Sequence, residues 1–283
     1  MFSVKQIKAN ARYVLRRSYW PSMVIVLLMI AAAAVSSLIT TMIGTGMRKL
    51  TGVSSFSFLY TDYFDYPSNV LSLAVYAVNF ITNNTVYFFM MGPIWLGIDR
   101  FFIATREQQN PVSFGYLRYG FTGEYLKKSW ANLSTALITW CWSIVIYIPV
   151  VIGTVLKHIT NNDNFKMFIF LSPIFMIPWF IAQLRYSMVP YIIANNGNIS
   201  GKRARELSTE MTTGHKMDLF LLELSFIGWI ILGIFAFILG FLFVVPYVYA
   251  ARAEAYTCLK TEIMQTKEIT DKKELPSLIG KSV

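Results

Sequence analysis

The chain has 283 residues, of which 55% are hydrophobic and only 14% are charged, and its formal net charge is +10. An ordinary soluble domain has ~25% charged residues, so this composition excludes a typical soluble globular protein. The two cysteines, Cys141 and Cys258, form no spaced motif, and we therefore expect free thiols and no disulfide framework.

Residues 3–18 are predicted to form a helix that lies along the inner membrane surface. Apolar side chains recur there at helical spacing among basic ones, as expected for an amphipathic interfacial helix. These apolar positions are Val4, Ile7, Ala11, Val14 and Leu15.

The next segment, residues 18–47, contains no charged side chain. Crossing a ~30 Å hydrocarbon core takes ~20 mostly apolar residues, so this segment predicts a first transmembrane helix at 21–43. Ala31 to Ala34 offer a cleavage site for a signal peptidase, but the apolar run continues through Ile39 and Ile43, which favours an uncleaved span.

Further apolar stretches follow along the chain. Residues 66–98, 129–156 and 224–251 contain no Asp, Glu, Lys or Arg, and residues 167–201 contain only Arg185. The last apolar block, 217–259, would be about 65 Å long as one helix, roughly twice the hydrocarbon thickness, so the chain must reverse within it. We place this break around Gly240.

These stretches predict an all-α fold, a polytopic membrane helix bundle with about six transmembrane helices. No linker rich in Pro, Gly or Ser divides the chain, so residues 1–262 are predicted to form one membrane domain and residues 263–283 a polar cytoplasmic tail. The six predicted spans are 21–43, 70–92, 131–154, 167–193, 219–239 and 241–258.

The placement of basic residues predicts the orientation. With six spans both termini lie on one side, and the opposite side holds only Arg48, Lys49, Lys157 and Lys166 of the 25 Lys and Arg residues. The positive-inside rule therefore places both termini in the cytoplasm. The net charge of +10 then reflects topology and contact with anionic lipid headgroups, and it requires no nucleic-acid partner.

The outer connection at residues 45–69 carries an acidic, aromatic patch. This patch can receive an external ligand or peptide, but Tyr is enriched where a bilayer meets water, so an interfacial belt is favoured. Its members are Tyr60, Asp62, Tyr63, Phe64, Asp65 and Tyr66.

The second predicted span carries several amides. Asn79 and Asn83 are four residues apart on one helix face, and Asn84 follows directly. Polar side chains at that depth are costly in lipid, so we expect them to point into the bundle. They form either a polar pathway for a substrate or hydrogen bonds between helices, each worth ~0.6 kcal/mol, and the second interpretation is favoured. Gly92 and Pro93 predict a kink in this helix, which then continues past the membrane.

Charges near the inner leaflet form a second candidate site. Arg185, Glu223, Arg252 and Glu254 are expected at similar depth, in one inner charge cluster. Such a cluster can gate a cytoplasmic entrance, but Arg also extends to lipid headgroups, and a structural role is favoured.

Enzyme motifs are absent from the sequence. The two histidines, His158 and His215, are predicted on opposite sides of the membrane and cannot share a metal ion. There is no G-x-S-x-G nucleophile motif, and residues 197–203 lack the glycine spacing of a phosphate-binding loop. Catalysis by Asp and Glu alone stays open, but no spacing in the sequence selects a pair of carboxylates. We therefore expect no catalytic residue, no metal and no cofactor.

The most distinctive local sequence starts at Ser208. It reads S-x-x-M-x-x-G-H-K-x-x-x-F and is followed by L-S-F-I-G-W from Leu224. This pattern resembles a family of bacterial integral membrane proteins catalogued as domain of unknown function 975. The resemblance implies a six-span protein of the bacterial plasma membrane and brings no agreed activity. Its motif residues here are Gly214, His215, Lys216, Ser225, Gly228, Trp229, Pro246 and Tyr247.

Two interpretations of this motif stay open. His215 can report cytoplasmic pH or bind a phosphate headgroup. The favoured alternative is structural: Gly214 permits a turn that fixes the amphipathic segment 201–211 against the bundle, while Ser225, Gly228 and Trp229 allow close helix packing.

The sequence therefore predicts a non-enzymatic membrane protein that handles, or gives protection from, a small amphipathic molecule or peptide. The alternative is a structural or regulatory membrane partner that docks another membrane or cytoplasmic protein through the loops at 114–125 and 201–217. A lipid-modifying enzyme is the third possibility, and it would need Glu223 close to another carboxylate.

Overall fold

The computed structural model of the protein describes residues 2–51, 70–107, 114–160, 170–235, 237–266 and 275–276. All regular secondary structure in these residues is helical, which confirms the predicted all-α class. The α-helices are α1 (Val4–Arg17), α2 (Tyr19–Thr51), α3 (Val70–Val86), α4 (Gly92–Glu107), α5 (Tyr125–Thr160), α6 (Ser172–Tyr186), α7 (Val189–Asn195), α8 (Gly201–Thr212), α9 (Lys216–Phe235) and α10 (Phe237–Thr266). A π-helical turn, η1 (Tyr87–Met91), joins α3 to α4, and a 3-10 helix, η2 (Phe114–Phe121), precedes α5.

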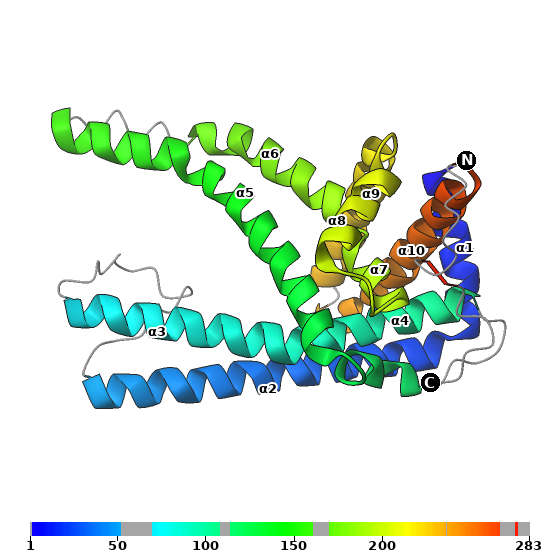
Figure 1. The fold of residues 1–283 in the computed structure, drawn as a ribbon, viewed down its shortest axis with the longest axis horizontal. Coiled ribbons are helices and arrows are strands. Elements are labelled where there is room, and N and C mark those ends of the chain that lie inside the picture. Colours follow the sequence, from blue (N-terminus) through cyan, green and yellow to red (C-terminus); the bar gives the residue numbers. More distant parts are fainter. Residues whose placement is uncertain are drawn as a thin grey trace.

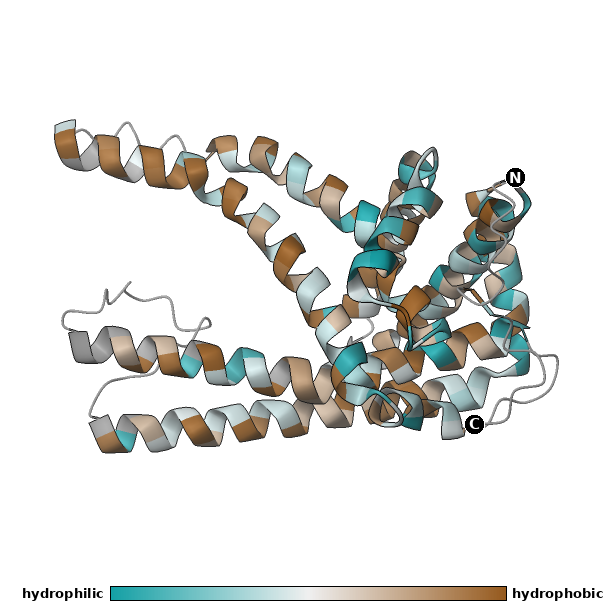
Figure 2. Ribbon diagram, in the orientation of Figure 1, coloured by the Kyte–Doolittle hydropathy of each residue, from teal (hydrophilic) through white to brown (hydrophobic). Residues whose placement is uncertain are grey.

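Two long hairpins diverge from a shared base (Figure 1). α2 and α3 lie side by side in one hairpin, and α5 and α6 form the other. We use "the base" for the opposite end, where α1, α4, η2, α7, α8 and the C-terminal half of α10 gather. Figure 2 shows that hydrophilic positions collect at the base, whereas the hairpins are mostly hydrophobic.

Four helical stretches within the described residues are long and apolar enough to cross a membrane: Tyr19–Met47, Ala77–Glu107, Tyr125–Gly153 and Lys216–Phe235. Only 17% of the apolar window in the first and 11% in the third is buried against the rest of the chain. Such exposure is unfavourable in water, but lipid chains solvate it. The length, composition and exposed surface of these helices therefore suggest a membrane protein.

The second predicted span forms one continuous helical path from α3 through η1 into α4. The π-helical turn lies directly before Gly92 and Pro93, where the sequence predicts a kink, and the helix continues to Glu107. The backbone of η2 packs directly on the backbone of α4 at Gly120. A side chain does not fit there, since a Cβ on Gly120 would overlap the Pro93 carbonyl oxygen. This close contact holds the second connection on the base.

The predicted fourth span, 167–193, is not one helix. α6 ends at Tyr186, α7 begins at Val189, and a turn at 187–188 separates them. Pro190 occupies the first turn of α7, where a missing backbone N–H breaks no helical hydrogen bond. The helix α6 has 15 residues and is therefore ~22 Å long, and residues 161–169 of the predicted connection and span lie outside the described residues.

α9 ends at Phe235 and α10 begins at Phe237, so the predicted break at Gly240 is wrong. Gly240 lies inside α10, and a Cβ at this position would come within 2.5 Å of the Gly233 Cα in α9. The glycine is needed because the two helices cross closely there, and it does not mark the turn. The acidic, aromatic patch predicted at residues 60–66 lies outside the described residues.

Candidate functional site

Opposite charges of α4 and α10 meet in the base. Lys260 Nζ lies 3.0 Å from Glu107 Oε1, and the two side chains are only 7% and 9% exposed. Asp99 is also buried and interacts electrostatically with Arg252. Asp99 and Glu107 are eight residues apart in α4, and Arg252 and Lys260 are eight residues apart in α10. This spacing is ~12 Å along each helix axis, so each acidic side chain of α4 meets a basic side chain of α10 when the two helices run in the same direction.

Side chains of α7 fill the space between these two pairs. The rings of Tyr191 and Tyr256 stack with centroids 5.7 Å apart. Tyr191 also interacts with the Asp99 carboxyl group, and Asn195 Nδ2 donates to the Tyr256 hydroxyl at 2.9 Å. Buried polar groups need such partners, so this network fixes α7 between α4 and α10.

Glu254 connects three helices. Its side chain is 1% exposed, forms an ion pair with Arg106 of α4 and accepts a hydrogen bond from Asn10 Nδ2 of α1 at 2.8 Å. The N-terminal helix is therefore joined to the end of α10 by a buried carboxylate.

The four residues predicted as one inner charge cluster do not come together. Arg252 donates to both carboxylate oxygens of Glu223 at 2.7 Å, whereas Glu254 binds Arg106 instead. Arg185 donates to Thr209 Oγ1 at 3.0 Å and joins α6 to α8. The predicted cluster is therefore confirmed only for the pair of Arg252 and Glu223. Arg252 and Glu254 are two residues apart in α10, so their side chains leave different faces of this helix.

A tyrosine ring between two cations holds the second connection in place. Arg100 Cζ lies 3.8 Å and Lys128 Nζ 3.7 Å from the centroid of the Tyr119 ring. Lys128 Nζ also donates to the carbonyl oxygens of Tyr119 and Thr122 at 2.8 and 2.7 Å. Burial raises the pKa of Tyr119 above its ordinary value, and the nearby Arg100 guanidinium partly offsets this rise.

The amides of the predicted polar pathway have different environments. Asn79 is buried and its Nδ2 donates to the Val75 carbonyl oxygen at 3.0 Å. Asn84 is half-buried, but Asn83 is exposed. The expectation that all three point into the bundle is therefore wrong for Asn83.

The motif turn is a junction between distant parts of the chain. Gly214 has a φ of +91°, which favours glycine. His215 Nε2 lies 2.8 Å from Glu262 Oε1, its Nδ1 lies 3.4 Å from Asp218 Oδ2, and its ring is 5.5 Å from that of Phe2. The turn therefore binds both the N-terminus and the end of α10.

The other motif residues pack to different extents. Lys216 begins α9 and is half-buried, and Ser225 Oγ accepts from Lys8 Nζ at 3.1 Å. Burial and the neighbouring Arg12 lower the pKa of Lys8 below its ordinary value. Pro246 is buried inside α10.

The expected close packing at Gly228 is wrong, because a Cβ there would have no neighbour within 4 Å. Trp229 is 49% exposed and makes an edge contact with the buried Tyr247. The close helix contact lies instead at Gly233 and Gly240.

Sequence reasoning missed Asp99, Glu107 and Lys260. The one signal in the sequence is the matching eight-residue spacing of charges in α4 and α10. Within the described part of the chain no three His, Cys, Asp or Glu residues are placed to hold a metal ion. Both oxygens of Glu223 are bound by Arg252, which does not favour a role for this carboxylate as a general acid or base.

The family model described as Protein of unknown function (DUF975) matches residues 1–262. This match confirms the resemblance carried by the motif from Ser208 onward. No curated protein and no solved structure matches the chain.

Proposed function

As this chain belongs to the DUF975 family, for which no activity is known, we propose a function from its geometry. The protein is a six-span protein of the bacterial plasma membrane with both termini in the cytoplasm. It is not an enzyme, and it binds a small amphipathic molecule or peptide within the bilayer, to handle it or to give protection from it.

The base supports the proposed orientation. α1 and the end of α10 lie together there through the hydrogen bond between Asn10 and Glu254, as expected when an even number of spans separates the termini. The outer face of α1 exposes Lys5, Arg12 and Arg16, and α1 contains no acidic residue in its first turn. This basic face suits anionic headgroups of the inner leaflet.

One observation carries the proposed ligand class: Asn83 is exposed within the membrane-spanning stretch Ala77–Glu107. It lies sixteen residues before Asp99, ~24 Å along the helical path, and is thus far from the polar base. Asn83 has no hydrogen-bond partner among the described residues, and an amide without a partner is costly in hydrocarbon. We infer that a bound molecule supplies the partner. An amphipathic molecule supplies a polar group for Asn83 and an apolar body for the surrounding hairpin surface.

The test is the binding of a dansyl-labelled amphipathic peptide to the protein in lipid nanodiscs, compared with empty nanodiscs. Asn83→Leu should weaken saturable binding by about 3- to 18-fold, because a hydrogen bond between groups in a membrane contributes ~0.6–1.7 kcal/mol. Size-exclusion chromatography checks that the amount of folded protein is unchanged.

Ile81→Leu is the matched control, because Ile81 is 62% exposed on the same helix. It should leave binding unchanged. Equal binding by Asn83→Leu and the wild-type protein, or a parallel loss of folded protein, would contradict the proposed binding of the ligand at Asn83.

A second candidate function is the docking of another protein on the connection formed by η2. Its inner side packs on α4, but Phe114 and Phe121 remain 47% and 51% exposed. Exposed aromatic side chains are enriched in protein interfaces. This function predicts that Phe121→Ser abolishes co-purification of a partner while Asn83→Leu has no effect.

A further inference from the structure

Two residues of the C-terminal tail are held in the base. Leu275 is 1% exposed and belongs to the same hydrophobic core as Leu259 and Ile263 of α10. The carbonyl oxygen of the next residue, Pro276, accepts a hydrogen bond from Lys260 Nζ at 2.9 Å. This part of the tail is therefore bound to the membrane domain by one apolar side chain and one backbone acceptor.

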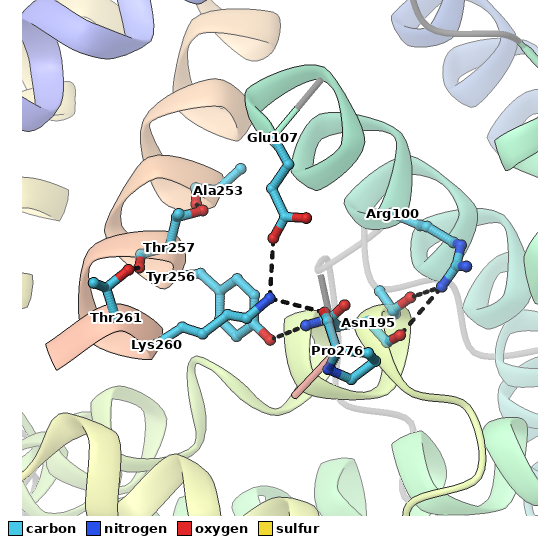
Figure 3. A network of polar contacts seen from close by, with 10 residues as sticks. Arg100, Glu107, Asn195, Ala253, Tyr256, Thr257, Lys260, Thr261 and Pro276 are labelled. Carbon is cyan, nitrogen blue, oxygen red and sulfur yellow. Dashed lines mark hydrogen bonds and ion pairs between the residues drawn. The ribbon is translucent and has the colours of Figure 1, made fainter. Parts of the chain in front are cut away.

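The Pro276 carbonyl meets a group of buried polar side chains. Figure 3 shows the Lys260 ammonium group between the Glu107 carboxylate and the Pro276 carbonyl, in one network with Asn195 and Tyr256. Lys260 has three N–H donors and is 6% exposed, so it needs acceptors inside the protein. Glu107 supplies one and the tail supplies another.

Asn195 adds a further unsatisfied group to this network. It is 3% exposed, and its Oδ1 atom has no hydrogen-bond partner among the described residues. A buried acceptor of this kind is costly, so the network has room for a hydrogen-bond donor that the described residues do not supply. The receiving surface thus has the chemistry of a binding site and does not complete its own hydrogen bonds.

The residues that bind the tail lie inside the part of the chain that the family model matches, and the bound residues lie outside it. Glu107, Asn195 and Lys260 lie within residues 1–262, which the family model covers, and Leu275 and Pro276 lie beyond them. The surface thus belongs to the family domain, while its occupant is the segment that follows.

We propose that Glu107, Lys260 and Asn195 form a peptide-binding site on the cytoplasmic end of the protein, and that the chain's own Leu275–Pro276 segment is its resident ligand. The site takes a peptide with one buried apolar side chain followed by a free backbone carbonyl. The tethered tail competes with any such peptide, because a short tether gives it an effective concentration of about millimolar. The proposal is independent of the ligand proposed for the hairpins.

The experiment measures binding of a fluorescent peptide of residues 267–283 to the full-length protein in nanodiscs by fluorescence anisotropy. Leu275→Asp in the protein removes its own tail from the site, because a charged side chain is not tolerated in the core. This variant should bind the free peptide roughly 10- to 100-fold more tightly than the wild-type protein, whose site is occupied. Leu275→Ala, which adds no charge, should give a smaller increase.

Two controls test the named contacts. A free peptide with Leu275→Asp should not bind either protein, and Lys260→Met added to the Leu275→Asp protein should weaken binding of the normal peptide at least about tenfold, as a charge-assisted hydrogen bond is lost. The proposal is wrong if the wild-type and both Leu275 variants bind the normal peptide equally or not at all. It is also wrong if the Leu275→Asp peptide binds as well as the normal one.

Discussion

Glu254→Gln should destabilise the base more than any exposed charge substitution. The side chain of Glu254 is 1% exposed and bonds to Arg106 and Asn10, so glutamine keeps its volume but loses its charge and one acceptor oxygen. Hydrogen bonds to charged groups contribute ~1.5–3 kcal/mol each, but Arg106 is 36% exposed and partly screened. We therefore expect a loss of about 2–4 kcal/mol in the free energy of unfolding.

The assay is thermal unfolding of the purified protein in detergent, followed by intrinsic fluorescence. A loss of this size lowers the melting temperature by about 5–12 °C in a protein of comparable size. The matched control is Glu206→Gln, because Glu206 is 47% exposed and its oxygen lies 3.6 Å from Arg203 Nη1. An exposed pair contributes ~0–1 kcal/mol, so the control should change the melting temperature by less than about 3 °C.

A double-mutant cycle with Asn10→Ala separates the contact between α1 and α10 from the loss of the ion pair. The hydrogen bond predicts a coupling free energy of about 1–2 kcal/mol between the two substitutions. Equal melting temperatures for Glu254→Gln and Glu206→Gln would refute the reasoning. Strict additivity of the two single substitutions would show that Asn10 does not bind the carboxylate.

Two further predictions concern the contact between α9 and α10 and the orientation of the chain in the membrane. Gly240→Ala should force α9 and α10 apart, because its Cβ meets the Gly233 backbone, and should cost about 1–3 kcal/mol of unfolding free energy in detergent. Gly228→Ala has open space and should leave the melting temperature unchanged or raise it; equal loss in both variants would contradict the close crossing. A reporter enzyme that works only in the cytoplasm should be active when it is fused after Lys260, and one that works only outside the membrane should be inactive. Activity of the second reporter would overturn the proposed orientation.

Local patterns predicted several elements of the fold, although the fourth span proved to be two helices and the break at Gly240 was wrong. The apolar residues of α1 include Ile7, Ala11 and Leu15, which are the positions buried in the structure. The glycine of the motif turn was also readable, since Gly214 has a positive φ. These features depend on residues close in the chain, and helical periodicity relates such residues directly to one face or one turn.

The contacts of the candidate sites could not be predicted in the same way. Glu254 was expected near Arg252 and Arg185 but binds Arg106 and Asn10. Pairing between helices depends on their axial offset and rotation, and the sequence of a single helix contains neither quantity. The long side chains of Arg and Glu can also reach several neighbours, so charge and depth alone do not select a partner.

By itself the sequence determined that the chain is helical, that it contains membrane-length apolar stretches and that a family motif marks the turn before α9. Only the tertiary structure decided that Asn83 is exposed while Asn79 is buried, and that Leu275 of a polar tail enters the core. The physical reason is that hydrophobicity and backbone preference act along the chain. Exposure depends on where other helices end or diverge, which is known only once all of them are packed together.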